Sequence, residues 1–560
     1  MTTVLARPRP LVRTAPPAPP SPQPTATAPG RSGPTTALVA YWPIVLAVVA
    51  FGAYLAAGCY MLYAVHYAIG DSLSRSEDAR AVLFSRDPHL AAWGFVWFPG
   101  PVVAELPFML IVSPLNHAAL AGPLSTATCG ALTVLVLVRL FRRLGLSEPV
   151  VAGLALTYAL NPVIIFYGGN GMSEGSFYLC ASVFLLGVVE WYQGGGPRSL
   201  ILISMGLAGA MTIRYEAIAI VPVVSALVSF RERGWARRAK VAVLVALPGV
   251  FVFALWTFAN WLIMGNALFW YQGQKAEAVP PPGAAWLPVH RTLVNGIAYA
   301  AGYTWAFVPA LVLVLPVLFV LVLRRRGRCW ELATIVGGAA IFPGQVALGI
   351  VAGTTWGDPR YFASLTIFAT VTLAFAAREV AWARWLGKPT RWALSLLLVC
   401  LAAYNALSGT RNDLNPDKTA VESEYVAFRA AFGLALPGGD VKAWQQPAIV
   451  TWHRFDDYID PYLSKGQLVM CDTGTAFPAV LFSRYPRQWV IPSDRDFQSL
   501  ADNFSGQFQW LLKTPSSATN FSSTPEIDQA LSSTDGGHWR LAKNFLGIGE
   551  LYRWVPAKVA

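Results

Sequence analysis

The chain has 560 residues, of which 55% are apolar and only 13% are charged. This composition excludes an ordinary soluble globular protein, because several uncharged apolar runs reach the roughly 20 residues that a helix needs to cross a bilayer. The net charge of +12 is concentrated in short segments between those runs, which argues against nucleic-acid binding.

The first 37 residues are rich in Pro, Ala, Thr and Arg and contain no aromatic side chain. Such a segment cannot bury a core, so residues 1–37 are predicted to be a disordered cytoplasmic tail. The apolar run that follows, 38–64, is too long for a signal peptide and has no clear cleavage site. We expect it to remain as a membrane anchor.

Apolar runs separated by polar breaks predict a multi-span α-helical membrane protein with about eleven spans in residues 38–409. The predicted spans are 38–64, 115–138, 150–167, 175–193, 199–213, 215–230, 241–264, 295–323, 332–352, 361–377 and 392–408. The first external loop, 65–114, ends in a shorter apolar run, 100–114, which contains Glu105 and two internal prolines. We interpret that run as an interfacial or re-entrant segment.

The distribution of basic residues predicts the orientation of these spans. In residues 1–409, the segments assigned to the cytoplasm hold 21 Lys and Arg against 5 Asp and Glu, whereas the opposite side holds 7 against 9. A bias of Lys and Arg toward the cytoplasm sets membrane topology. The N-terminus is therefore predicted to be cytoplasmic, and residues 410–560 to be extracytoplasmic.

Residues 410–560 differ in composition from the rest, with 14 Lys and Arg and 16 Asp and Glu. An amphipathic helix is predicted at 422–433, and buried strands at 467–472, 488–493, 508–514 and 549–555. This pattern favours an independent soluble α/β domain. The six cysteines show no metal-ligand spacing, and Cys471 in this region is predicted to be structural.

Ionisable residues gather at the predicted external ends of the spans. Nine acids lie on that side: Asp71, Glu77, Asp78, Asp87, Glu105, Glu174, Glu216, Glu277 and Asp358. Each could be an ordinary solvated loop residue. However, charged groups near membrane depth usually pair and line a cavity, and Asp71, Glu174, Arg214 and Arg360 all lie at or close to span ends.

A carboxylate beside one or two arginines suits the transfer of a group from a lipid phosphate. The carboxylate can take a proton from an acceptor hydroxyl, and a guanidinium can hold and stabilise the departing phosphate. Because the lipid donor brings its own anchor, such a site must lie at the membrane interface.

The order of these features resembles the C-type (GT-C) glycosyltransferases that use polyprenyl-phosphate sugars. This superfamily includes the protein O-mannosyltransferases and the lipid A aminoarabinose transferases. The resemblance is carried by Asp71 directly after the first span, "SRDPHLAAWGFVWFPGP", the interfacial run, "RLFRRLG", "YGGNGMSEGSFY", "AGAMTIRYEAIAIVP" and "GDPRYF". It covers about residues 38–408 as an ordered set of short motifs.

The resemblance implies a role for each matching residue. Asp71 would be the catalytic base and Glu174 a second acid that orients the acceptor. Arg214, Arg360 and Tyr361 would bind the lipid phosphate or its sugar. Many relatives have Glu directly after the first Asp, whereas this chain has Ser72, so Glu77 and Asp78 stay open as the base or as ligands of a divalent metal.

Two further residues, Asp87 and His89, could assist substrate binding. Their alternative role is purely local, with the Asp capping a turn and the His packed on it.

The predicted activity is that of an inverting glycosyltransferase, a hexosyl- or pentosyltransferase, in a bacterial plasma membrane. It would move sugar from a polyprenyl-phosphate donor to an extracytoplasmic glycan, lipid or protein acceptor, and the residues do not identify the sugar. One alternative is a transporter or flippase of a lipid-linked or anionic substrate. Such folds usually have two related halves and broken helices at mid-membrane, which the sequence does not indicate. An inactive scaffold is the other alternative.

Overall fold

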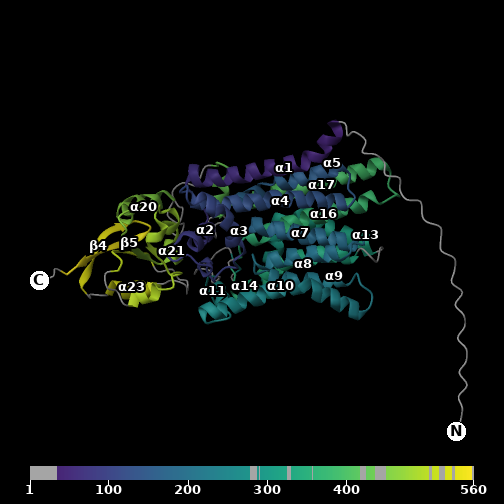
Figure 1. Ribbon diagram of the computed structural model, residues 1–560. Coiled ribbons are helices and arrows are strands. Elements are labelled where there is room, and N and C mark those ends of the chain that lie inside the picture. Colours follow the sequence, from purple (N-terminus) through teal and green to yellow (C-terminus); the bar gives the residue numbers. More distant parts are fainter. Residues whose placement is uncertain are drawn as a thin grey trace, which may run out of the picture. The chain divides into compact units, whose positions relative to one another are not determined.

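The computed structural model describes residues 34–277, 287–288, 290–323, 329–355, 357–415, 424–434, 449–502, 507–515, 524–532 and 536–557. The chain divides into two units at residue 42, and helix α1 (Pro34–Cys59) has residues in both. Most of the predicted N-terminal tail therefore lies outside the described residues. The other helices and the sheet all belong to the second unit (Figure 1).

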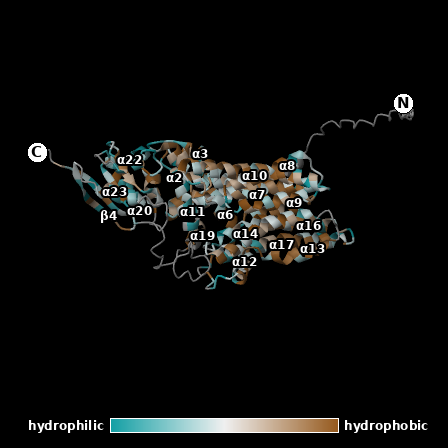
Figure 2. Ribbon diagram, turned by 90° about the horizontal axis from the view of Figure 1, so that it is seen from below, coloured by the Kyte–Doolittle hydropathy of each residue, from teal (hydrophilic) through white to brown (hydrophobic). Residues whose placement is uncertain are grey.

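Seven helices in the described residues are long and apolar enough to cross a membrane. They are Tyr41–Val65, which contains most of α1, Ala118–Arg143, which contains α4 (Ala121–Arg143), α7 (Ser173–Tyr192), α10 (Trp235–Met264), α14 (Cys329–Ala352), Arg360–Ala381, which joins α15 (Arg360–Ala363) to α16 (Leu365–Ala381), and α17 (Lys388–Asp413). In Figure 2, hydrophobic residues dominate α10, α13 and α17.

Two further pairs of apolar helices are bent at a short break. Helix α5 (Glu148–Ala159) meets α6 (Pro162–Gly169) at 56°, and α12 (Leu293–Phe307) meets α13 (Pro309–Leu323) at 99°. In both pairs a proline begins the second helix, where its fixed φ is tolerated and its missing N–H costs nothing. Counting each bent pair as one span gives nine spans in the described residues.

The multi-span helical class is confirmed, but the described residues support seven to nine spans instead of eleven. The difference lies in α8 (Pro197–Met211) and α9 (Ala217–Ser229), which have 15 and 13 residues. Each is shorter than the roughly 20 residues of a full span. Residues 212–216, which separate these two helices, hold Arg214 and Glu216.

Contacts at one end of the helices join segments that were all predicted to be cytoplasmic. Arg139 on α4 lies 3.3 Å from the Glu190 carboxylate on α7. Arg378 on α16 pairs with Glu331 on α14 through two contacts of 2.8 Å. Arg231 donates to the Gly195 carbonyl at 2.9 Å. Each contact thus joins two helix ends or turns that lie in or next to the segments predicted to be cytoplasmic.

The C-terminal region contains a five-stranded sheet with the order β2-β1-β3-β5-β4. Its strands are β1 (Val469–Cys471), β2 (Trp489–Val490), β3 (Trp510–Lys513), β4 (Gly537–Phe545) and β5 (Gly549–Pro556). Strand β1 pairs in parallel with β2 and β3, and β5 pairs antiparallel with β3 and β4. The accompanying helices are α19 (Glu424–Ala431), α20 (Ile449–Leu463), α21 (Thr473–Phe482), α22 (Phe497–Asp502) and α23 (Thr524–Ser532).

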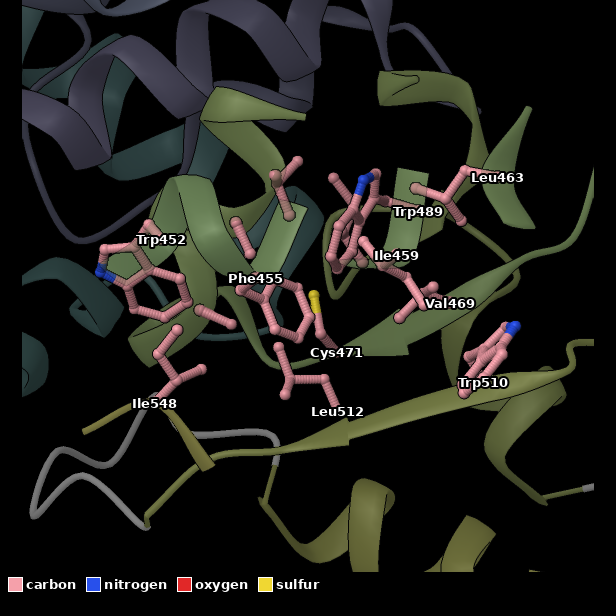
Figure 3. Packing of buried hydrophobic residues seen from close by; sticks show 14 of the residues in the cluster. Trp452, Phe455, Ile459, Leu463, Val469, Cys471, Trp489, Trp510, Leu512 and Ile548 are labelled. Atoms are coloured by element: carbon pink, nitrogen blue, oxygen red, sulfur yellow. The ribbon is translucent and has the colours of Figure 1, made fainter. Parts of the chain in front are cut away.

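The core of this α/β region also includes residues from the first external loop. Trp452, Phe455 and Trp489 pack together in it, and each is 3% exposed or less (Figure 3). Ala81 and Val82 belong to the same cluster. They lie on α2 (Gly70–Phe84), a helix inside the predicted loop. The α/β region predicted as an independent domain therefore shares its core with a segment that precedes it by hundreds of residues.

Two further α-helices are α3 (Gly100–Val112), which is the predicted interfacial segment, and α11 (Phe269–Glu277). Helix α2 begins at Gly70 and packs against α3 and α21. Gly171 has a φ of +76°, and a Cβ atom there would lie 2.2 Å from the Ser72 hydroxyl oxygen. A glycine is required on both counts, and it allows the turn before α7 to approach the first turn of α2.

Candidate functional site

Asp71 lies in the first turn of α2, next to two arginines. Its Oδ2 atom is 3.1 Å from Nη1 of Arg360 and 3.6 Å from Nη2 of Arg75. The Asp71 side chain is 30% exposed, whereas those of Arg360 and Arg75 are 12% and 4% exposed. Negative charge is favoured at a helix N-terminus, so the helix itself also stabilises the Asp71 carboxylate.

Arg360 is brought to Asp71 from a position 289 residues later in the chain. It begins α15, and its Nε atom lies 3.7 Å from Oδ2 of Asp358. The guanidinium carbon of Arg360 is 5.6 Å from the centre of the Tyr361 ring. The guanidinium carbon of Arg214 is 5.8 Å from the same ring centre. Tyr361 therefore contacts both arginines through cation–π interactions.

Arg214 is enclosed by two carboxylates. It pairs with Glu174 in the first turn of α7, and with Glu216 through contacts of 2.6 Å and 3.1 Å. All three side chains are 6% exposed or less. The two bonds to Glu216 form a bidentate pair, which is the strongest arrangement available to arginine. The structure therefore holds Arg214 and Glu174 in a buried ion cluster that shares the Tyr361 ring with Arg360.

The electrostatic balance of the cluster keeps Asp71 ionised. Burial alone would raise the pKa of Asp71, but the guanidiniums of Arg360 and Arg75 outweigh this effect and hold the pKa below its ordinary value. Three arginines, at 75, 214 and 360, face four carboxylates, at 71, 174, 216 and 358. Of these four carboxylates, Asp71 is the most exposed. It is therefore the carboxylate that an incoming molecule can reach first.

Asp78 lies on the same face of α2 as Asp71 and Arg75, because the three residues are spaced at i, i+4 and i+7. Burial raises the pKa of Asp78 well above its ordinary value, and the neighbouring Glu77 adds to this effect. The guanidinium of Arg75 packs 5.3 Å from the Trp97 ring centre. Asp78 thus lies about 10 Å from Asp71 along the same face of α2, at 1.5 Å per residue.

Glu77 points away from this face and is 3% exposed. Burial raises its pKa to about 8 and Asp494 adds to the shift, although Arg80 opposes it. Glu77 is thus protonated in the folded chain at neutral pH, and its Oε1 atom has no hydrogen-bond partner. The Glu77 carboxyl group is therefore less suited to act as a general base than the Asp71 carboxylate, which is ionised and more exposed.

The buried Glu77 predicts a pH-dependent stability. Between the ordinary pKa of 4.5 and about 8, the folded chain keeps the Glu77 proton and the unfolded chain loses it. The contribution of Glu77 to the free energy of unfolding is therefore fully present below about pH 4.5, and it is lost as the pH rises to about 8. Glu77→Gln should remove this dependence and stabilise the chain at pH 8 by about 1–3 kcal/mol.

Thermal unfolding in detergent at pH 5 and pH 8 would measure this effect. The gain of Glu77→Gln over the unaltered chain should be larger at pH 8. The control is Asp502→Asn, which changes an exposed carboxylate on α22. Its effect on the melting temperature should be the same at pH 5 and at pH 8. If the melting temperatures of Glu77→Gln and the unaltered chain differ by the same amount at both pH values, Glu77 does not keep its proton in the folded chain.

Asp87 and His89 lie apart from the Asp71 cluster. The Asp87 carboxylate pairs with the Arg495 guanidinium and accepts from the Arg495 backbone N–H at 3.1 Å. His89 Nδ1 lies 2.7 Å from the Asp87 carbonyl oxygen. The structure therefore places Asp87 at a contact with the C-terminal region and His89 beside Asp87, and neither is assigned a part in the reaction proposed below.

The structure brings together Asp71, Glu174, Arg214, Arg360 and Tyr361, and it adds Arg75, which was not among the predicted site residues. Its signal was the i, i+4 spacing to Asp71, which has meaning only on a helix. Residues 65–114 are predicted as a loop, in which this spacing places no two side chains together, whereas the structure has α2 there. Among the described residues, no group of three or more His, Cys, Asp and Glu side chains is arranged to hold a metal ion.

Comparisons with known proteins add little to this geometry. No protein-family model matches the chain. No curated protein matches it either. Among solved structures, the chain is similar to the crystal structure of ArnT from Cupriavidus metallidurans bound to undecaprenyl phosphate. The two share 12% sequence identity with a TM-score of 0.47, over 93% of this chain and 99% of that chain.

Proposed function

We propose that this protein is an inverting glycosyltransferase that moves a sugar from a polyprenyl-phosphate donor to an acceptor hydroxyl. The observation that supports it most is the pair formed by Asp71 and Arg360. An ionised, partly exposed carboxylate contacts an arginine that begins a short helix, at one end of an apolar helical bundle. A base and an anion ligand are thus in direct contact where a lipid-anchored substrate would arrive.

The reaction needs one proton acceptor and one phosphate ligand. The acceptor oxygen forms a bond to the anomeric carbon of the donor, from the side opposite the phosphate. The bond between that carbon and the phosphate oxygen breaks, and its electron pair stays with the polyprenyl phosphate. Asp71 takes the proton of the acceptor hydroxyl, and Arg360 stabilises the phosphate as its negative charge grows.

Donor binding would also release the base. Arg360 lowers the pKa of Asp71 in the structure. A donor phosphodiester that binds Arg360 would compete with the Asp71 carboxylate for the same guanidinium. Losing that contact would raise the basicity of Asp71 when the donor is in place. The hydrogen-bond donors of Arg214 are already occupied by Glu174 and Glu216. We therefore assign Arg214 to supporting Tyr361 and Arg360, and not to direct binding of the phosphate.

The membrane orientation is part of the proposal. The surplus of Lys and Arg on one side favours a cytoplasmic N-terminus, with the Asp71 cluster and residues 410–560 outside. The site would then work at the extracytoplasmic face of a bacterial plasma membrane. The test is a reporter enzyme that works only in the cytoplasm, fused to the C-terminus of the protein. Activity of this reporter in cells would contradict the orientation.

The test uses purified full-length protein in liposomes that contain radiolabelled polyprenyl-phosphate mannose or polyprenyl-phosphate arabinose. With a cell-envelope extract as acceptor, label should move from the lipid fraction to the extract, and polyprenyl phosphate should accumulate in equal amount. Intact labelled donor that only changes leaflets would indicate a transporter instead. No change in either fraction with both donors would contradict transferase activity toward these sugars.

A further inference from the structure

Helix α2 takes part in two regions of the molecule. Its first turn carries Asp71 beside Arg360. Its second half carries Ala81 and Val82, which lie in the hydrophobic core of the C-terminal α/β region. From Asp71 to Arg80 the helix rises about 13–14 Å at 1.5 Å per residue. The position of the Asp71 carboxylate therefore depends on how firmly the second half of α2 is held.

Arg80 joins α2 to the end of α21. Its Nη1 atom lies 2.8 Å from each of the carbonyl oxygens of Val480, Leu481 and Ser483. Carbonyls in the last turn of a helix have no partner within the helix, and a cation there is also favoured by the helix dipole. Nε of Arg80 donates to the Ser113 hydroxyl at 3.1 Å, directly after α3. One guanidinium thus connects α2, α3 and α21.

The surroundings of Arg80 make these contacts hard to replace. The residue is 3% exposed. Burial lowers its pKa to about 10, and the carboxyl groups of Asp456, Glu77 and Asp460 act against that shift. Arg80 is therefore charged at neutral pH. A buried charge is costly unless it is paired and hydrogen-bonded, so the guanidinium is restricted to this set of carbonyl and hydroxyl partners.

The far end of α2 is fixed to the same region by a second set of contacts. Arg86, two residues after the helix ends, donates to the Asp494 carboxylate at 2.9 Å and 3.1 Å. Asp87 pairs with Arg495, as described above. A tilt of about 5° at Arg80 would displace Asp71 by about 1 Å over that length of helix. Displacements of this size reduce catalysis by about 100-fold in other enzymes.

We propose that Arg80 is a positioning residue: by bonding to the last carbonyls of α21, it fixes α2 so that Asp71 meets the acceptor hydroxyl. The C-terminal α/β region would then act on catalysis through α2. This inference rests on the proposed glycosyltransferase function. It assigns Arg80 no contact with donor or acceptor.

Three variants of the full-length protein test this role: Arg80→Lys, Arg80→Gln and Arg80→Ala. A lysine ammonium carries three donors that can replace the carbonyl contacts, a glutamine amide can replace part of them, and alanine replaces none. We expect kcat to fall by less than 3-fold, by about 10-fold and by about 100-fold, respectively. Binding of polyprenyl phosphate should stay within 3-fold of the unaltered chain, because Arg360 remains. Arg540→Ala, an exposed arginine on β4, is the matched control.

Two results would overturn the inference. One is a kcat that does not decline in this order among the folded variants. The other is a loss of polyprenyl-phosphate binding that parallels the loss of kcat, which would indicate general unfolding. If Arg80→Ala does not fold, the comparison of Arg80→Lys with Arg80→Gln decides by the same criteria.

Hydrogen exchange separates a failure of this inference from a failure of the proposed function. Amides of the first half of α2 should exchange about 10-fold faster in Arg80→Gln, whereas amides of α7 should not change. This result would support the positioning of α2 even if the unaltered chain transferred no sugar. Unchanged exchange in α2 would contradict it, whatever the activity of the protein.

Discussion

Asp71→Asn is expected to lower kcat for sugar transfer by about 10²–10⁴-fold, the usual contribution of a general base. Asparagine keeps the shape of the side chain but cannot accept the proton of the acceptor hydroxyl. Polyprenyl-phosphate binding should be unchanged or tighter, because Arg360 no longer pairs with a carboxylate at position 71. Single-turnover transfer of radiolabel and a separate binding titration would measure the two effects.

The matched control for this variant is Asp457→Asn, which changes an exposed carboxylate on α20. It should leave both kcat and donor binding unaltered. Normal turnover by Asp71→Asn would remove Asp71 as the base and return Glu77 and Asp78 to consideration. Weaker donor binding together with a lower melting temperature would show instead that the residue is needed mainly for folding.

Arg360→Ala should weaken polyprenyl-phosphate binding by about 10–100-fold, the loss expected for charge-assisted hydrogen bonds of about 1.5–3 kcal/mol. It should lower kcat as well, because the phosphate that leaves would lose its stabilising charge. The variant also removes the cation that most lowers the pKa of Asp71. The acidic limb of the profile of kcat/KM against pH should therefore move to higher pH.

Arg360→Lys tests the importance of guanidinium geometry. It keeps the charge but loses the fixed planar fork, so donor affinity should lie between those of Arg360→Ala and the unaltered chain. Arg291→Ala is the control, since Arg291 is exposed and its guanidinium lies beside Gly353. Equal donor affinity in the unaltered chain and Arg360→Ala would contradict a phosphate-binding role for Arg360.

The helical bundle was largely predictable because long apolar runs leave few alternatives in a membrane protein. The number of spans was not, because hydropathy cannot separate a full span from two short helices that meet at a polar turn. Residues 199–213 and 215–230 were predicted as two spans, yet α8 and α9 have only 15 and 13 residues. The turn between them carries Arg214, which belongs to a buried cluster with Glu174 from another helix.

The sheet shows the same limit. The four strands predicted from apolar runs are present, but β4 was missed. Strand β4 pairs on one side, with β5, and most of its residues are partly or fully exposed, including His538, Arg540 and Lys543. Edge strands commonly carry charged residues that discourage further pairing. A strand of this kind has no apolar run by which the sequence could reveal it.

The candidate site was predictable as a set of charges at span ends, and the structure brings Asp71, Arg214 and Arg360 into one cluster. The supporting residues were not predictable. Arg75 and Arg80 gain their meaning from a helix inside the predicted loop, and the three carbonyl partners of Arg80 lie 400 residues or more further along the chain. Asp87 was also placed by such a distant contact, since it pairs with Arg495.

The shared core of α2 and the C-terminal sheet has a consequence for how the chain is made. During translation, Ala81 and Val82 are synthesised early, whereas their packing partners in the same core, which include Phe545 on β4 and Leu551 on β5, leave the ribosome hundreds of residues later. Until then this apolar surface has no native cover, and early-exposed surface of this kind is prone to aggregate. A stop codon in the last strands would therefore impair an element near the beginning of the polypeptide, far from the truncation itself.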